Sequence, residues 1–254
     1  MKKKIGSIVT ALLLTFSLGS VVFAGNAISS SSKVTYKANE ITDLKLLFEK
    51  AKERKTDLPE NTPRKAALLK DGESKDIQVY QTTQRLQVVK DTKTNNNIRE
   101  SYVTYEFYNV PKDALKEGTI STLGSKEDEK WDSSYSVKAY STYYFDRYYD
   151  QNGLPYRDLT KVSGGWVIDD SSVAVTNKEV WFGASGGALR TDGTAGGTVI
   201  QDSPHYFPTS LSFSYSAPSS WRPVADSASS IGVTTKATLK RNTSTWTLQF
   251  ANSN

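Results

Sequence analysis

The pattern Gly-x-Ser-x-Gly, typical of a serine nucleophile, occurs as Gly183-Ala184-Ser185-Gly186-Gly187. An esterase-type site needs an acid and then a histidine later in the chain, and Asp192 or Asp202 followed by His205 meets that order. It also needs a helix after the serine, and the glycine-rich residues 188–197 are a poor helix. Trypsin-like proteases place their histidine before the serine, whereas the single histidine here follows it. We therefore interpret Ser185 as a loop serine and assign no catalytic residue.

Paired carboxylates could instead support glycoside hydrolysis. Glu106, Asp146 and Glu179 fall in segments that alternate like β-strands, where a β-sheet enzyme could place them. The pattern does not say which of them face each other. The alternative is that these acids are solvated on the polar face of the sheet.

Metal sites have little support in the sequence. One histidine and no cysteine do not suit a typical zinc site. The segment Asp150-Gln151-Asn152-Gly153 lacks the flanking ligands of an EF-hand, and we interpret it as a hairpin turn. A calcium site built from separated loops, using Asp169 and Asp170, stays open. No metal and no cofactor are assigned.

Three tyrosines form the most suggestive binding pattern. In the alternating segment 135–149, Tyr140, Tyr144 and Tyr148 point to the face opposite Tyr143 and Phe145. A row of tyrosines with polar neighbours can stack on sugar rings or anchor a protein partner. We predict these three as binding residues. The alternative is that they pack under a neighbouring strand, the N-terminal helices or a loop.

Short alternating runs with glycine and asparagine turns predict a mainly β fold, an antiparallel β-sandwich over residues 131–254. A β-hairpin is predicted at 76–110, and a polar connection at 111–130. Residues 28–75 are predicted as a flexible leader (28–38) and two short helices, at about 40–55 with Asn39 as its cap and at 63–70 ending at Gly72.

Two groups of segments carry a family resemblance. The first is Gln81-Thr82-Thr83-Gln84-Arg85-Leu86, and the second runs from Lys138-Ala139-Tyr140-Ser141-Thr142-Tyr143-Tyr144 through Thr160–Trp166 to Ala237–Arg241. Together they resemble a loose group of uncharacterised secreted proteins of Gram-positive bacteria, over about residues 76–250. The resemblance implies secretion and a β fold, and it brings no activity or functional residue.

The N-terminus has the three parts of a secretory signal at residues 1–27. Lys2, Lys3 and Lys4 precede an uncharged apolar segment, and small residues allow cleavage after Ala24 or after Ala27. The chain has 32 Lys and Arg against 27 Asp and Glu, a net charge of +5, and removal of the three signal lysines leaves +2. No basic excess of the kind that nucleic-acid binding requires remains. We expect no stable membrane anchor after cleavage.

These observations predict a secreted, non-catalytic binding protein that acts at the cell surface or in the medium. Its expected partner is cell-wall or host glycan, or an extracellular protein. Two alternatives stay open: a secreted pore-forming or antimicrobial β protein, supported by the many Ser, Thr and Tyr residues, and a secreted hydrolase.

Overall fold

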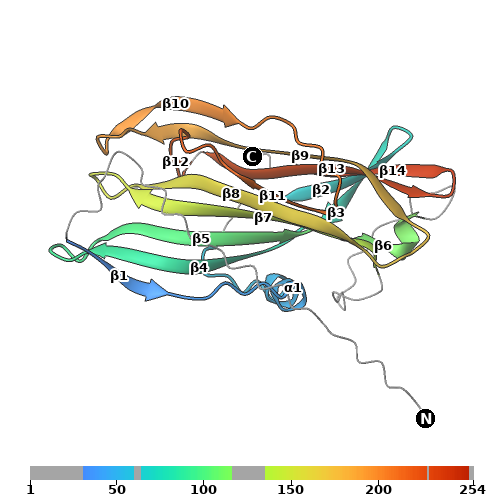
Figure 1. The fold of residues 1–254 in the computed structure, drawn as a ribbon, viewed down its shortest axis with the longest axis horizontal. Helices are drawn as coiled ribbons and strands as arrows, with labels where there is room; N and C mark the ends of the chain where they lie inside the picture. The colour runs from blue at the N-terminus through green and yellow to red at the C-terminus, as the bar shows by residue number, and fades with distance from the viewer. Residues whose placement is uncertain (1–30, 60–63, 116–134, 228, 252–254) are drawn as a thin grey trace, which may run out of the picture.

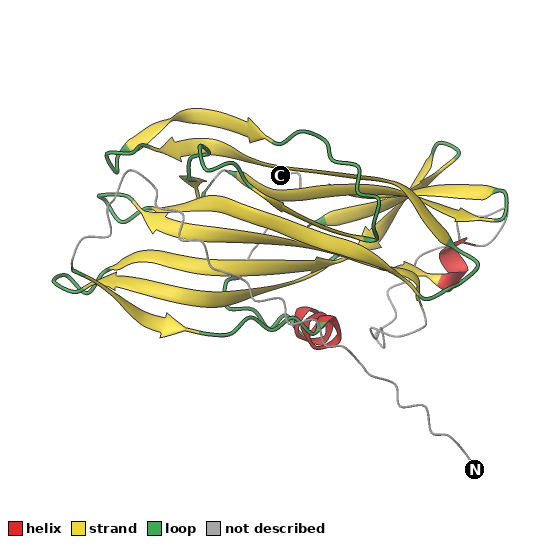
Figure 2. Cartoon of the chain, in the orientation of Figure 1, coloured by secondary structure: helices red, strands yellow, loops and turns green. Residues whose placement is uncertain are grey.

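The computed structural model of the 254-residue chain describes residues 31–59, 64–115, 135–227 and 229–251. Strands dominate these residues and run along the length of the molecule (Figure 2). The strands are β1 (Ser32–Lys37), β2 (Lys65–Lys70), β3 (Glu73–Gln78), β4 (Tyr80–Asp91), β5 (Asn97–Phe107), β6 (Val110–Pro111), β7 (Tyr135–Tyr149), β8 (Pro155–Ile168), β9 (Ala174–Leu189), β10 (Ala195–Asp202), β11 (Ser212–Ser216), β12 (Val224–Ala225), β13 (Ser230–Arg241) and β14 (Ser244–Ala251). The helices are α1 (Leu44–Lys52) and the 3-10 turn η1 (Lys112–Leu115).

The strands pair antiparallel in one continuous sheet (Figure 1). One half has the order β1-β4-β5-β7-β8, and we call it the β7 half; the other, β9-β13-β14-β2-β3, we call the β9 half. β10 pairs with β9, β11 with β8, and β6 with β7. β12 joins the halves, because Val224 pairs with Arg157 of β8 and with Ala188 of β9.

The sheet curls so that both halves bury side chains in one shared core. Phe145 and Val162 from the β7 half and Phe182 from the β9 half belong to the same buried cluster. Tyr108, which follows β5, is fully buried and stacks on Phe250 of β14 at 4.7 Å between ring centroids. The mainly β, antiparallel prediction is therefore confirmed, whereas a sandwich of two separate sheets is not.

Helix α1 covers the outer face of the β7 half, away from the shared core. The Asp43 side chain caps it by accepting hydrogen bonds from the amides of Lys45 (2.9 Å) and Leu46 (3.0 Å). Leu47, Phe48 and Ala51 are buried against three side chains of β5. That second, smaller cluster is completed by Val103, Tyr105 and Phe107.

The predicted second helix, at 63–70, is wrong. Residues Lys65–Lys70 form β2, which pairs with β3 on one side and β14 on the other. Asp71 and Gly72 both have positive φ, at 50° and 86°, as a two-residue hairpin turn of type I′ requires. Gly72 therefore closes a hairpin and does not end a helix.

Three further expectations differ from the structure. Residues 32–37 of the expected flexible leader form β1, which pairs with β4. The helix cap is Asp43 rather than Asn39. The polar connection begins with η1, whose Ala114 and Leu115 are fully buried.

The predicted hairpin segment contains β4 and β5, which pair with each other across a turn with Asn95 at φ 58°. The predicted signal (1–27) and residues 116–130 of the connection lie outside the described residues. Over the part of the chain that is described, the helices are too short to span a bilayer.

Candidate ligand-binding site

A shallow hollow of about 200 Å³ lies on the outer face of the β9 half, over β9, β10 and β13. Figure 1 shows these strands on the other side of the molecule from α1. The residues that line it are Trp181, Phe182, Gly183, Ala184, Ser185, Ile200, Asp202, Ser230, Gly232 and Thr234.

Glycines create the hollow, because strand register places two of them side by side. Gly183 of β9 lies opposite Gly232 of β13 and opposite Asp202 of β10. Directly opposite residues project to the same face of a sheet, so no side chain projects from this face at Gly183 or at Gly232. A Cβ added to Gly183 would lie 2.7 Å from Asp202 Oδ1. The carboxylate therefore lies close over the bare backbone of β9.

The rows before and after the glycines supply the walls. On one side, Trp181 pairs with Thr234. On the other, Ser185 pairs with Ile200 and Ser230. Ile200 has 78 % of its surface exposed, the largest exposed fraction among the large apolar side chains of the described residues. The hollow thus combines an aromatic ring, an exposed aliphatic side chain and several hydroxyl groups.

His205 holds the Trp181 ring in place. The imidazole stacks on the indole with ring centroids 4.6 Å apart and an interplanar angle of 8°. His205 Nδ1 lies 2.6 Å from Glu179 Oε1, so the carboxylate orients the imidazole. His205 is not part of the hollow's lining. The indole is covered by the imidazole on one face, and Trp181 also lines the hollow.

Three polar groups of the hollow have no hydrogen-bond partner among the described residues. They are the Asp202 carboxylate and the hydroxyl groups of Ser185 and Thr234. Asp202 also forms no ion pair with any described Lys or Arg. These groups are available to a ligand that donates and accepts hydrogen bonds.

The arrangement does not support the serine-hydrolase pattern. Ser185 lies in β9, not at a strand-to-helix turn. His205 stacks on Trp181, which is four strand residues, or about 13 Å, from Ser185 along β9. Its Nδ1 contacts Glu179. Among the described residues, no histidine therefore lies beside the serine.

The predicted tyrosine row is partly buried. Tyr140 and Tyr144 pack against the cluster formed by α1 and β5. The Tyr144 hydroxyl donates to Glu40 Oε1 at 2.8 Å, and Tyr105 donates to the same oxygen at 2.6 Å. Burial raises the pKa of Tyr140 and of Tyr144. These contacts match the alternative in which the N-terminal helix covers the row.

Tyr148, the third member of the row, is also partly buried. Its hydroxyl lies 3.5 Å from Asp146 Oδ2, and burial raises its pKa. As a binding residue, each of the three tyrosines remains a prediction.

The three carboxylates considered for hydrolysis lie in separate environments. Glu106 is fully buried, with Arg64 3.6 Å from its Oε1 and the Ser141 hydroxyl 3.1 Å from its Oε2. Glu179 orients His205 on the β9 half. Asp146 lies on the outer face of the β7 half. The structure does not bring any two of the three together.

Asp146 has a different acidic neighbour, Asp158, directly opposite on β8. Only 3 % of Asp158 is exposed. Burial, and then repulsion from Asp146, raise the pKa of Asp158 to about 8. Burial also raises the pKa of Asp146, although the Ser101 hydroxyl donates to it at 2.6 Å. This pair holds a proton at neutral pH, but the hollow described above is not formed around it.

The loop carboxylates considered for calcium are engaged by cations of the chain. Asp169 pairs with Lys138 Nζ at 2.6 Å, and Asp170 pairs with Arg241. Among the described residues there is no group of three or more acidic, His or Cys side chains arranged to hold a metal ion. Asp150 Oδ1 accepts from the amides of Asn152 and Leu154, both at 2.8 Å, which is the geometry of a turn.

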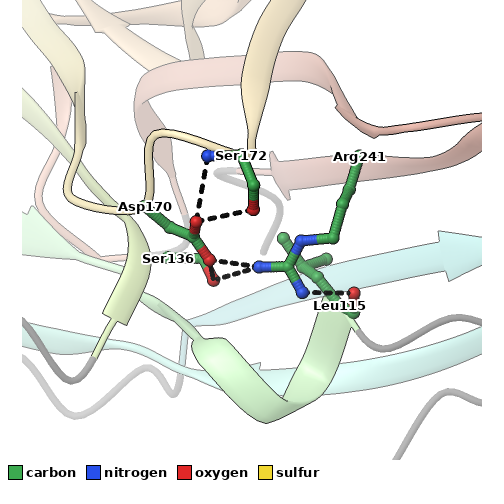
Figure 3. A network of polar contacts seen from close by, with 5 residues as sticks. All are labelled: Leu115, Ser136, Asp170, Ser172 and Arg241. Atoms are coloured by element: carbon green, nitrogen blue, oxygen red, sulfur yellow. Dashed lines mark hydrogen bonds and ion pairs between the residues drawn. The ribbon is translucent and has the colours of Figure 1, made fainter.

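Arg241 is the centre of a polar network at one end of the molecule (Figure 3). It donates to the carbonyl of Leu115 at 2.7 Å and contacts Asp170 and Ser136. Asp170 also accepts from the hydroxyl (2.6 Å) and the amide (3.0 Å) of Ser172, and these bonds lower its pKa. The network joins η1, β7, β13 and the loop before β9, and we assign it a structural role.

Trp181 was missed by the sequence analysis, which considered Asp202 only as a possible triad acid. A signal was present, since Glu179, Trp181, Gly183 and Ser185 alternate with apolar residues and therefore share the polar face of a strand. A tryptophan on a polar face beside glycine indicates an exposed ring.

No family model matches the chain, and no curated protein or solved structure is significantly similar to it. The resemblance to secreted proteins of Gram-positive bacteria remains a prediction. Any functional assignment therefore has to come from the geometry of this chain.

Proposed function

We propose that this is a secreted, non-catalytic protein that binds glycan at the cell surface or in the medium, through the hollow on the β9 half. The observation that carries the proposal is the combination of the partly exposed Trp181 ring with the unpaired Asp202 carboxylate beside the two glycines. An indole stacks on the apolar face of a sugar ring, and a carboxylate accepts hydrogen bonds from sugar hydroxyl groups.

The shape of the hollow also favours a glycan. It lies on an open sheet surface and holds about 200 Å³, the volume of roughly seven waters. One sugar unit of a longer chain can rest in such a hollow while its neighbours extend along the sheet. Ser185 and Thr234 supply hydroxyl groups at the two ends of the glycine gap.

Co-sedimentation with insoluble bacterial cell wall tests this proposal. The chain is produced in a Gram-positive host with its N-terminus intact and recovered from the medium, which tests secretion in the same preparation. We expect saturable binding by the wild type and a loss of at least about fivefold in affinity for Trp181→Ala, since truncation of a central aromatic contact costs more than about 1 kcal/mol.

Phe207→Ala is the matched control, because Phe207 is 70 % exposed and is not part of the lining of the hollow. Equal loss in both variants would contradict a specific role for the hollow. Loss in Tyr148→Ala, with Trp181→Ala unaffected, would move the site to the tyrosine row.

A further inference from the structure

The hollow has an uncompensated negative charge. Asp202 is the one ionisable residue among those that line it, all of which belong to the described chain. Glu179, two residues before Trp181 on β9, is engaged by His205 at 2.6 Å and by Lys236 at 4.0 Å, and neither of these partners lines the hollow. A ligand that enters the hollow therefore meets a carboxylate without a counter-charge.

This carboxylate lies close to the backbone of β9. A Cβ at Gly183 would lie 2.7 Å from Asp202 Oδ1 and 2.9 Å from the carbonyl of Gln201. The charge thus lies directly beside the gap that the two glycines leave, one strand row from Trp181.

A carboxylate next to an indole face is a suitable environment for an ammonium group. The carboxylate gives an ion pair, and the ring gives a cation–π interaction. The same charge repels carboxylate groups of acidic sugars, and it has no charge to pair with in an N-acetylated sugar. Specificity follows from this difference between ligands of similar shape.

Resting on the proposed function, we infer that the hollow selects amino sugars with a free ammonium group, of the glucosamine type, over N-acetylated and acidic sugars. Trp181 stacks on the ring of the bound sugar, and Asp202 pairs with its ammonium group. Ser185 and Thr234 contact the hydroxyl groups.

Isothermal titration with three tetrasaccharides tests the inference: tetra-glucosamine, tetra-N-acetylglucosamine and tetra-galacturonate. We expect the wild type to bind tetra-glucosamine at least about fivefold more tightly than the N-acetylated form, with a preference that weakens as salt increases. Asp202→Asn is expected to remove the preference, so that this variant binds tetra-glucosamine and tetra-N-acetylglucosamine with similar affinity.

Asp192→Asn is the control, because it removes the same charge from the exposed turn between β9 and β10 and leaves the hollow unchanged. Equal or tighter binding of tetra-N-acetylglucosamine by the wild type would overturn the inference and leave the proposed function in place. A preference that survives in Asp202→Asn would also overturn it. Absence of binding to all three glycans and to cell wall would instead overturn the proposed function.

Discussion

At Asp158, burial and a like-charged neighbour act in the same direction on one carboxyl group. The folded protein holds a proton there up to a pH of about 8, because its pKa is raised to about 8 from an ordinary value of 3.8. The unfolded chain loses that proton near pH 4. Between these two values the unfolded state binds fewer protons than the folded state, so the free energy of unfolding falls as the pH rises.

We therefore expect Asp158→Asn to stabilise the protein at pH 8 and to have little effect at pH 4. Asparagine is neutral and similar in shape, so it removes the cost of keeping an acid protonated. The contribution of Asp158 to the pH dependence is at most about 1.4 kcal/mol per pH unit. Urea unfolding midpoints at pH 4, 6 and 8 measure it; parallel pH profiles for the variant and the wild type would contradict the expectation.

Gly183 gives a second prediction for a single residue. In Gly183→Ala the new methyl group would meet Asp202 Oδ1 and a backbone carbonyl at less than 3.0 Å. We expect a loss of about 1–3 kcal/mol in stability from overpacking, together with loss of cell-wall binding as the hollow fills. Gly187→Ala, with no heavy atom within 4 Å, is the control on the same strand. Unfolding and co-sedimentation measure the two effects, and equal behaviour of both variants would refute the steric argument.

The candidate site shows what a sequence can and cannot indicate about single residues. Alternation along β9 places Trp181, Gly183 and Ser185 on one face. It does not place Asp202 or Gly232 beside them, because that neighbourhood depends on the register of β10 and β13. The Gly-x-Ser-x-Gly pattern singled out Ser185 as a possible nucleophile, whereas in the structure Ser185 lines the hollow.

Among the elements, α1 shows how a short helix is maintained by the sheet. It has only nine residues, too few to be stable alone, and it is held by a cap and by burial of one side. Phe48 is fully buried in this contact, with its ring edge-on to Tyr80 and Phe107 at 5.3 and 5.5 Å between centroids.

Phe48→Ala is expected to cost about 3–5 kcal/mol in the local stability of α1 and to expose Tyr140 and Tyr144. Hydrogen exchange followed by mass spectrometry should show faster exchange in residues 44–52 and no change in β9. Leu46→Ala, at a position 47 % exposed on the same helix, should exchange like the wild type. Unchanged protection of α1 in Phe48→Ala would show that other contacts hold the helix.

Sequence reasoning about elements succeeded where one pattern dominated and failed where two patterns competed. Residues 63–70 contain apolar residues at both helical and strand spacing, and a run this short does not distinguish a helix from a strand. The Asp71-Gly72 pair carried the deciding information, since it favours a hairpin turn. The pairing of β2 with β14 could not be predicted locally, because 173 residues (71–243) lie between the two strands.

For the whole molecule, contacts between the two halves across the core decide whether the sheet stays curled. Tyr108 makes two such contacts. Its ring stacks on Phe250, and its hydroxyl forms a hydrogen bond of 2.7 Å with the hydroxyl of Thr235. Both residues belong to the β9 half, while Tyr108 follows a strand of the β7 half.

Tyr108→Phe keeps the stacked ring and removes the hydroxyl group, so we expect a loss of about 0.5–1.5 kcal/mol in the free energy of unfolding. Tyr36→Phe, at a residue 39 % exposed on β1, should have no measurable effect. Urea denaturation followed by circular dichroism gives both values. An unchanged midpoint in Tyr108→Phe would show that the hydrogen bond between the halves contributes nothing net.

The position of β14 between β13 and β2 has a consequence for biosynthesis. β14 is the last of the described strands to leave the ribosome, while β2 and β3 are among the first. Without β14, the hairpin of β2 and β3 has no other described strand to pair with. A chain in this order stays incomplete until translation has passed residue 251. For the secreted protein that we propose, such delayed completion would keep the precursor loose enough for translocation, with folding finished on the far side of the membrane.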